Sequence, residues 1–297
     1  MLSRAFYHSR PRAYAPRRVT QGLCLDPTAT PLRMLCSATP PLISVSEVAG
    51  APRTRELKLQ KPPVNTFDKH MLELFVQTLH EIEADPDVDG IILTSDNPKV
   101  YSAGLDLQSL LQPTEAQFAG FWTALEDFVA AYYTSPLYVV AAIRGSAPAL
   151  GAILAVGADY RLMEDGEKFR IGLNETSLGM VPPRWLSLMT SRTIGVRQAE
   201  RHLGGSSMLS PRSALAVGLI DEVCDGSDEL MARAVAISVE AGRIPAAARA
   251  GYKQSERQCV KDVCGPESVA TMAECILSDE FQANLAAIVE KLKNRKK

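Results

Sequence analysis

Two short stretches contain residue types that could together carry out proton-transfer chemistry on an activated acyl group. They are Tyr101-Ser102-Ala103-Gly104-Leu105-Asp106-Leu107 and Ile171-Gly172-Leu173-Asn174-Glu175-Thr176-Ser177-Leu178-Gly179. A run of small residues between them, 145–152, opens an apolar helix. Small residues let a backbone approach a ligand closely, and the free N–H groups of a first helical turn can donate to a developing oxyanion. The pattern therefore indicates an oxyanion site beside an acid/base group.

Glu175 is the acid/base candidate. Its loop is rich in glycine and polar residues, and apolar side chains such as Leu173 and Met180 lie nearby in the sequence. A carboxylate in apolar surroundings has a raised pKa, which suits it to take and return a proton near neutrality. Asn174 could bind substrate or hold the loop. Alternatively, Glu175 caps a turn or pairs with Arg184.

The other two stretches also have structural interpretations. Gly104 could be an ordinary turn glycine and Asp106 a helix cap, and 145–152 could reflect tight packing of a buried helix. Three histidines, His70, His80 and His202, fall on expected helix surfaces or in a charged segment, so we interpret them as structural. The sequence contains no G-x-S-x-G, P-loop or dinucleotide-binding motif.

Composition excludes several classes of protein. The 297 residues carry a formal charge of −2 with mixed signs, which gives no electrostatic case for nucleic acid binding. No apolar run approaches the roughly 18 residues of a membrane span, so we expect a soluble protein without one. Six cysteines form no C-x-x-C pair and have no histidine at ligand spacing. We therefore predict no metal site and reduced thiols.

The first 25 residues differ from the rest of the chain. They contain five arginines, and the first acidic residue is Asp26. A basic leader without acid and without a continuous apolar region is typical of a mitochondrial transit peptide. The alternative is a disordered basic arm. We assign residues 1–40 to this leader and expect ordered structure to begin between Thr39 and Ser46.

The elements that must position the two loops alternate between strand and helix. We predict antiparallel strands at 42–46 and 55–59, helices at 66–85 and 115–133, and strands at 90–94, 138–143, 159–163 and 169–171. This rhythm is typical of α/β architecture with crossover units. Beyond Pro183 the pattern is mostly helical, and a short strand follows Asp221. We divide the chain into a core at 41–225 and a helical region at 226–297.

Taken together, these segments resemble the crotonase (enoyl-CoA hydratase/isomerase) superfamily, and within it the mitochondrial Δ3,Δ2-enoyl-CoA isomerases. The resemblance covers roughly Ile43 to Lys293. It is carried by the following stretches: Lys61-Pro62-Pro63-Val64-Asn65, Ile91 to Asp96, Tyr101 to Leu107, Asp159-Tyr160-Arg161, Ile171 to Gly179 and Ser213 to Asp221. It implies a spiral of ββα units with a helical C-terminal region that mediates trimerisation, and hence a homotrimer.

The resemblance also implies roles for individual residues. The N–H groups of Ala103 and Leu150 would form the oxyanion hole, and Glu175 would be the catalytic glutamate. Asn174 and the segment Ala103 to Leu107 (Ala103, Gly104, Leu105, Asp106, Leu107) would line the acyl-CoA site. Trp185 and Phe121 could line an acyl tunnel or belong to the core. No cofactor is implied, because coenzyme A is part of the substrate.

Two positions depart from the pattern of related hydratases. Their second glutamate is replaced here by apolar Ile153, and Leu150 stands where relatives often have glycine. A proton shuttle needs one carboxylate, whereas water addition benefits from two. We therefore expect an isomerase of the mitochondrial matrix that moves the double bond of 3-enoyl-CoA to trans-2-enoyl-CoA in β-oxidation. The alternatives are a hydratase or hydrolase on the same fold, or a catalytically silent acyl-CoA-binding protein.

Overall fold

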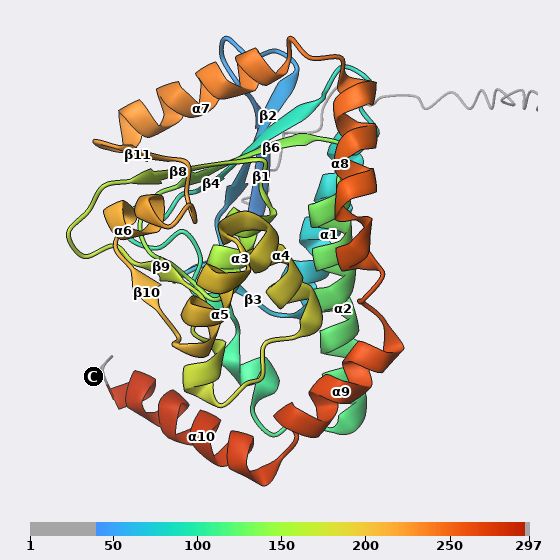
Figure 1. The fold of residues 1–297 in the computed structure, drawn as a ribbon, viewed down its shortest axis with the longest axis vertical. Coiled ribbons are helices and arrows are strands. Elements are labelled where there is room, and N and C mark those ends of the chain that lie inside the picture. The colour runs from blue at the N-terminus through green and yellow to red at the C-terminus, as the bar shows by residue number, and fades with distance from the viewer. Residues whose placement is uncertain (1–39, 295–297) are drawn as a thin grey trace, which may run out of the picture. The chain divides into compact units, whose positions relative to one another are not determined.

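The structure is a computed structural model that describes residues 40–294 (Figure 1). The proposed leader lies outside these residues, except for its last position. The core is a six-stranded sheet in the order β1-β2-β4-β6-β8-β11. Its strands are β1 (Ile43–Glu47), β2 (Thr54–Leu59), β4 (Gly90–Ser95), β6 (Tyr138–Ile143), β8 (Tyr160–Glu164) and β11 (Glu222–Cys224). Only β1 and β2 pair antiparallel, as predicted; the remaining neighbours are parallel.

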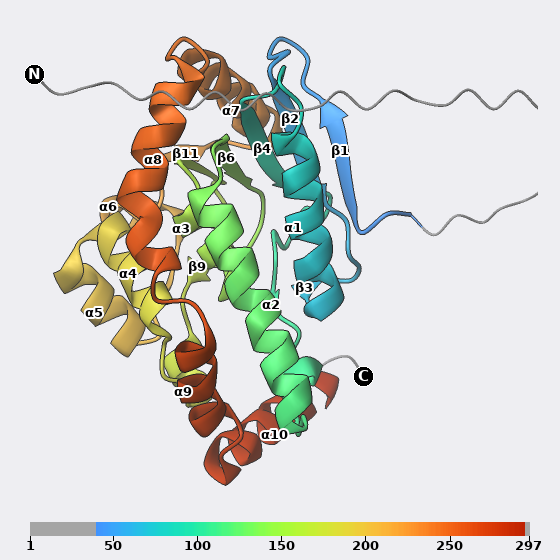
Figure 2. The ribbon, with the colours of Figure 1, turned by 90° about the vertical axis from the view of Figure 1, so that its right-hand side faces the viewer.

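Helices cover both faces of this sheet, which explains the continuous apolar runs. In β6, Val139 and Ala141 face one apolar cluster, whereas Val140 and Ala142 face the other. Helix α7 (Ser227–Ala241) covers the second face, while α1 (Lys69–Glu83) and α2 (Glu115–Thr134) lie side by side on the first (Figure 2). Strands buried on both faces need apolar residues at every position. The predicted α/β architecture is confirmed.

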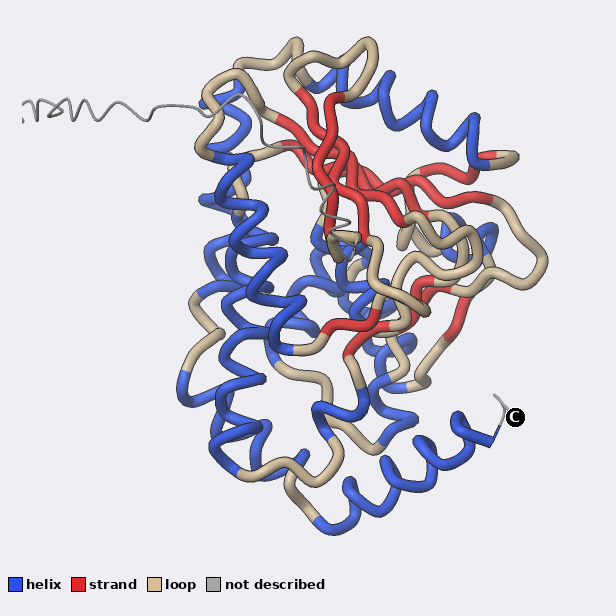
Figure 3. The backbone as a smooth tube through the Cα atoms, turned by 180° about the vertical axis from the view of Figure 1, so that it is seen from behind, coloured by secondary structure: helices blue, strands red, loops and turns tan. Residues whose placement is uncertain are grey.

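Five two-residue strands lie apart from the main sheet (Figure 3). They are β3 (Thr66–Phe67), β5 (Gly104–Leu105), β7 (Ala147–Pro148), β9 (Ile171–Gly172) and β10 (Met208–Leu209). Strand β3 pairs with β5, and β9 pairs with both β7 and β10. The helix expected from Thr66 therefore begins later, at Lys69, because Asp68 caps it by accepting from the Met71 N–H.

The remaining elements follow these strands. They are η1 (Leu107–Leu110), α3 (Leu150–Gly157), η2 (Glu175–Leu178), α4 (Arg184–Ile194), α5 (Val196–Gly204), α6 (Pro211–Ala216), α8 (Ala246–Lys261), α9 (Pro266–Ile276) and α10 (Asp279–Asn294). After β11 the described residues form helices only. Within residues 40–294, none of the helices has the length and apolarity required to cross a membrane.

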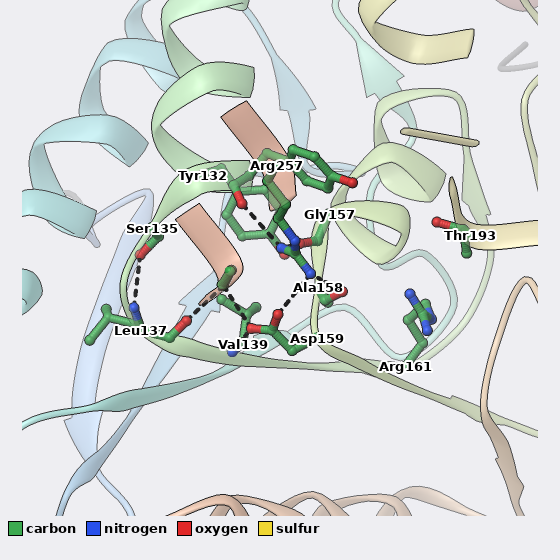
Figure 4. A network of polar contacts seen from close by, with 12 residues as sticks. Tyr132, Ser135, Leu137, Val139, Gly157, Ala158, Asp159, Arg161, Thr193 and Arg257 are labelled. Atoms are coloured by element: carbon green, nitrogen blue, oxygen red, sulfur yellow. Dashed lines mark hydrogen bonds and ion pairs between the residues drawn. The ribbon is translucent and has the colours of Figure 1, made fainter. Parts of the chain in front are cut away.

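A buried ionic network fixes α8 to the sheet (Figure 4). The Asp159 carboxylate accepts from Lys253 Nζ and from the Arg257 guanidinium, each at 2.7 Å, and from the Val139 N–H at 2.8 Å. Lys253 Nζ also donates to the Leu137 carbonyl O at 2.7 Å. Burial lowers the pKa of Lys253 to about 8, opposed by the charge of Asp159. Because one carboxylate serves two cations, Asp159 is the centre of this network.

Candidate active site

The three segments singled out in the sequence meet at one place in the fold. The Tyr101 N–H donates to the Ser146 carbonyl O at 2.9 Å, and the Ala149 N–H donates to the Gly172 carbonyl O at 2.9 Å. These bonds join the loop after β4, the turn before α3 and the strand before η2. Residues 45 and 23 positions apart in the sequence are thereby held against one another around a single cavity.

Glycines allow the first two segments to approach this closely. A Cβ on Gly104 would lie 2.9 Å from Ala149 Cβ and 3.3 Å from Leu150 N. A Cβ on Gly151 would lie 2.5 Å from the Ser102 carbonyl O. Gly104 also has φ +94°, a conformation that other residues rarely adopt. Gly104 is thus more than a turn glycine, because its missing side chain brings two peptide segments into contact.

The first loop is held from behind by buried polar groups. Ser102 Oγ donates to the Asn65 carbonyl O at 2.7 Å and accepts from the Gly104 N–H at 3.2 Å. The Asn65 amide nitrogen donates to Ser95 Oγ at 2.8 Å and to the Tyr101 carbonyl O at 3.0 Å. All these side chains are buried, so the bonds fix the loop.

The backbone donors differ in part from those expected. The Ala103 N–H donates to the Val64 carbonyl O at 2.9 Å, and the Asp106 N–H donates to the Phe67 carbonyl O at 2.8 Å. The amide of Ala103 is therefore already in use, and the role of oxyanion donor expected for it does not fit this geometry. Successive N–H groups of a strand point to opposite sides. The Leu105 N–H accordingly points away from β3, and Leu105 lines the cavity.

Leu150 occupies the place expected of it. It is the first residue of α3, and its N–H has no acceptor among the described residues. The preceding residue, Ala149, has φ +50° and ψ −120°, a strained conformation for a residue with a side chain. The positive φ thus falls on Ala149, so a leucine at the next position retains a usable N–H without needing the freedom of glycine.

A cavity of about 330 Å³ lies against these donors. Of the substrate-binding candidates, Ala103, Leu105, Leu107, Leu150 and Asn174 line it, whereas Gly104 and Asp106 do not. Asp106 caps η1 by accepting from the Gln108 N–H at 3.1 Å, as the structural interpretation held. Trp185 lines the cavity, but Phe121 belongs to the core and the adjacent Trp122 takes its place.

Sequence reasoning missed the contribution of α10. Its residues Ile288 and Leu292 line the cavity, and Figure 2 shows the helix below α9 and the lower end of α2. The Gln282 side chain fixes this arrangement, because it accepts from the Gln112 N–H at 2.7 Å and donates to the Leu110 carbonyl O at 3.0 Å. The helical pattern of α10 was visible in the sequence, but nothing local linked it to the two loops.

Glu175 is the only titratable residue among the described residues that line the cavity. Its side chain is 6 % exposed, and its Oε2 atom has no hydrogen-bond partner within the described chain. Burial raises its pKa to about 7, and its own backbone N–H partly offsets this. No ion pair with Arg184 occurs between residues 40 and 294. An unpaired carboxylate in an apolar cavity is suited to exchange a proton with a bound molecule.

Other candidates lie away from the cavity. His70 and His80 are exposed on α1, and His202 is on α5. Cys224, Cys259, Cys264 and Cys275 are free thiols, and the described residues contain no cluster of three side chains that could hold a metal ion.

Asn174 lines the cavity, and its Oδ1 atom is buried without a partner in the described chain, so this atom is available to a ligand.

Comparison with known proteins agrees with this geometry. The family model for enoyl-CoA hydratase/isomerase matches residues 54–295. The mouse protein "Enoyl-CoA delta isomerase 1, mitochondrial" is 36 % identical over 84 % of this chain and 87 % of its own length, and its human counterpart is 35 % identical over 81 % and 80 %.

Solved structures show the same relationship. The crystal structure of human mitochondrial delta3-delta2-enoyl-CoA isomerase matches with a TM-score of 0.83 at 35 % identity, covering 86 % of this chain and all of its own. An enoyl-CoA hydratase from Bacillus halodurans shares the fold, with a TM-score of 0.73 at 20 % identity over 83 % of this chain and all of its own. This chain belongs to the enoyl-CoA hydratase/isomerase family.

Proposed function

We propose that the protein is a Δ3,Δ2-enoyl-CoA isomerase, which converts 3-enoyl-CoA to trans-2-enoyl-CoA during oxidation of unsaturated fatty acids. The observation that carries this proposal is a single unpaired carboxylate, Glu175, in an otherwise apolar cavity beside unused backbone amides. Ile153 lines the same cavity, and the resemblance to hydratases would place their second glutamate at this position. Identity of 35–36 % to named isomerases supports the same reaction.

In the proposed mechanism the thioester oxygen lies between the N–H groups of Leu105 and Leu150. Glu175 removes a proton from C2, and the electron pair of that bond moves onto the thioester oxygen to give a dienolate. The protonated Glu175 then returns the proton at C4, and the double bond settles between C2 and C3. Backbone donors aimed at a developing oxyanion each contribute about 10²–10³ in rate. Coenzyme A enters as part of the substrate, and the proton transfer itself calls for no cofactor.

The raised pKa of Glu175 sets the expected pH dependence. The base must be ionised to remove the first proton, so kcat/KM should rise with pH through about pH 7 and reach a plateau above it. A pKa near neutrality also helps the return step, because the protonated carboxyl is then a competent acid. A carboxyl at its ordinary pKa would be a weaker base for the weakly acidic C2 proton.

Among the alternatives, a hydratase is disfavoured by Ile153, since an isoleucine cannot activate water. A hydrolase would also need access of water to the thioester, and the cavity walls are largely apolar. A silent binding protein would have no use for a buried unpaired Glu175, because burying such a group costs stability.

We propose location in the mitochondrial matrix and assembly into a homotrimer. The names of the mouse, rat and human relatives contain the word mitochondrial, and the basic leader at residues 1–40 is compatible with import as a transit peptide. The trimer is an expectation from the family, and sedimentation analysis of the purified protein would test it.

The test is an ultraviolet assay of the purified protein with cis- and trans-3-enoyl-CoA, following formation of the conjugated 2-enoyl thioester. Glu175→Gln should lower kcat by about 10²–10⁴ with little change in CoA binding. Glu167→Gln, the same change on an exposed residue eight positions earlier, is the matched control and should behave as the parent. Parental turnover in Glu175→Gln would remove this residue from the mechanism. No turnover by the parent would reject the isomerase.

A further inference from the structure

A chain of hydrogen bonds ties the turn that carries Glu175 to the segment that follows α5. The Ser177 N–H donates to Ser206 Oγ at 2.6 Å, Ser206 Oγ and Thr176 Oγ1 share a hydrogen bond, and Thr176 Oγ1 donates to the Leu203 carbonyl O at 2.7 Å. The two hydroxyl residues are 30 positions apart in the sequence. Thr176 and Ser177 directly follow Glu175, so these bonds act on the backbone of its turn.

The directions of these bonds are fully determined. A hydroxyl has one proton to donate, and Thr176 gives its proton to the Leu203 carbonyl O. Ser206 must therefore donate to Thr176, and it accepts from the Ser177 N–H. Such a one-way chain strengthens each of its members. Ser206 is its central link, because it is both donor and acceptor between two residues of η2.

The backbone of Ser206 is arranged for this contact. Ser206 has φ +48°, a left-handed conformation that costs a residue with a side chain about 1–2 kcal/mol. Immediately afterwards the chain enters β10, which pairs with β9 just before the Glu175 loop (Figure 1). A Cβ on Gly172 would lie 2.1 Å from the Ser207 carbonyl O. The segment 206–209 therefore contacts the Glu175 loop before Glu175, through the pairing of β10 with β9, and after it, through the bond from Ser177 to Ser206.

We propose that Ser206 is a positioning residue for Glu175: its hydroxyl holds the η2 turn so that the carboxylate stays inside the apolar cavity. This inference rests on the proposed role of Glu175. The Glu175 side chain has an unpartnered Oε2 atom in the described chain, and most residues that line its cavity are apolar. Its position therefore depends on the turn, and Ser206 holds the turn at two residues, Thr176 and Ser177.

The decisive variant is Ser206→Gly, which removes the hydroxyl but favours φ +48°, so that the protein should fold with a Tm close to that of the parent. We expect kcat to fall by about 10- to 100-fold, the range that a small misplacement of a reacting group produces, with KM nearly unchanged. Ser207→Ala is the matched control, because the Ser207 hydroxyl makes no hydrogen bond among the described residues.

A second readout separates positioning from a general structural effect. A looser turn lets water reach the carboxylate, so the acid limb of the pH–rate profile should move below pH 7 in Ser206→Gly. The shift can be assigned to Glu175, because no other titratable side chain among the described residues lines the cavity. Thr176→Val, which breaks the same chain, should reproduce both changes without adding to them, and Thr176→Ser should restore the parental values.

The proposal is overturned if folded Ser206→Gly keeps the parental kcat and acid limb, or if Ser207→Ala loses as much activity. Titration of Glu175 by NMR of carbon-13-labelled glutamate needs no turnover and should show a lower pKa for Glu175 in Ser206→Gly. A parent without isomerase activity would reject the proposed function, while this titration would still decide the role of Ser206. An unchanged Glu175 titration in Ser206→Gly would reject the positioning role alone.

Discussion

Replacement of Gly104 by alanine tests whether the close approach of two backbone segments creates the oxyanion site. The new Cβ would meet Ala149 Cβ at 2.9 Å and Leu150 N at 3.3 Å. The first distance is shorter than a comfortable contact, and the atoms concerned belong to backbone or to a side chain of one carbon. Neither can rotate away, so one of the two segments must move.

The expected magnitudes differ for activity and stability. A positive φ costs an alanine about 1–2 kcal/mol, which corresponds to a loss of roughly 2–8 °C in Tm for a domain of this size. Displacing the Leu150 or Leu105 amide removes a donor from the developing oxyanion and should lower kcat by about 10²–10³. Binding of CoA should change much less, because in the proposed mechanism the displaced amides donate to the thioester oxygen.

Gly218→Ala is the matched control for this experiment. Gly218 has φ +77°, and a Cβ there would have no neighbour within 4 Å. It therefore imposes the same kind of backbone penalty without a collision and away from the cavity. Gly104→Ala should lose more thermal stability than Gly218→Ala, measured by calorimetry, because it adds a collision to the same backbone penalty, and only Gly104→Ala should lose turnover in the ultraviolet assay. Parental kcat in a folded Gly104→Ala protein would refute the oxyanion geometry described above.

Three further outcomes are expected. Burial raises the pKa of Glu175 from its ordinary value of 4.5 to about 7 in the folded protein, so parental stability should fall as pH rises from 4.5 to 7. Glu175→Gln should remove this loss and be at most about 3 kcal/mol more stable than the parent above pH 7. Equal denaturation midpoints of the two proteins at pH 8 would contradict this. Ile153→Glu places a second carboxylate in the cavity and should move the acid limb of the pH–rate profile above pH 7; an unmoved limb would show that the two groups do not interact. Asp159→Asn leaves Lys253 and Arg257 without their carboxylate and should cost about 3–5 kcal/mol of stability with unchanged kcat, as measured by denaturant unfolding and turnover.

The sequence was sufficient for the long elements and for the one carboxylate of the cavity. Apolar periodicity located α1, α2 and the main strands, since each has enough residues to show its period. Glu175 could be identified because a carboxylate amid apolar residues is chemically unusual. Leu150 could be identified because it begins an apolar helix.

The unused amide of the first loop, which we propose as an oxyanion donor, could not be located in the same way. Which amide is unused depends on the pairing of β3 with β5, and a two-residue strand shows no period. The choice between Phe121 and Trp122 depends on the rotation of α2, which the sequence fixes only to within a residue. Ser206 gave no signal at all, because its importance comes from a contact with Thr176 across 30 positions.

The unused amides beside Glu175 should also allow the cavity to bind a molecule other than the substrate, namely a free fatty acid. Below pH 7 the carboxyl is mostly neutral, and the N–H groups of Leu105 and Leu150 face a space shaped for an acyl chain. A free fatty acid offers that space a carboxylate in place of a thioester oxygen. Such an acid should therefore inhibit competitively in the weakly acidic range. Its affinity should fall as Glu175 ionises, because the two carboxylates then repel each other. Alkaline conditions should thus protect the enzyme from inhibition by the hydrolysed form of its own substrate.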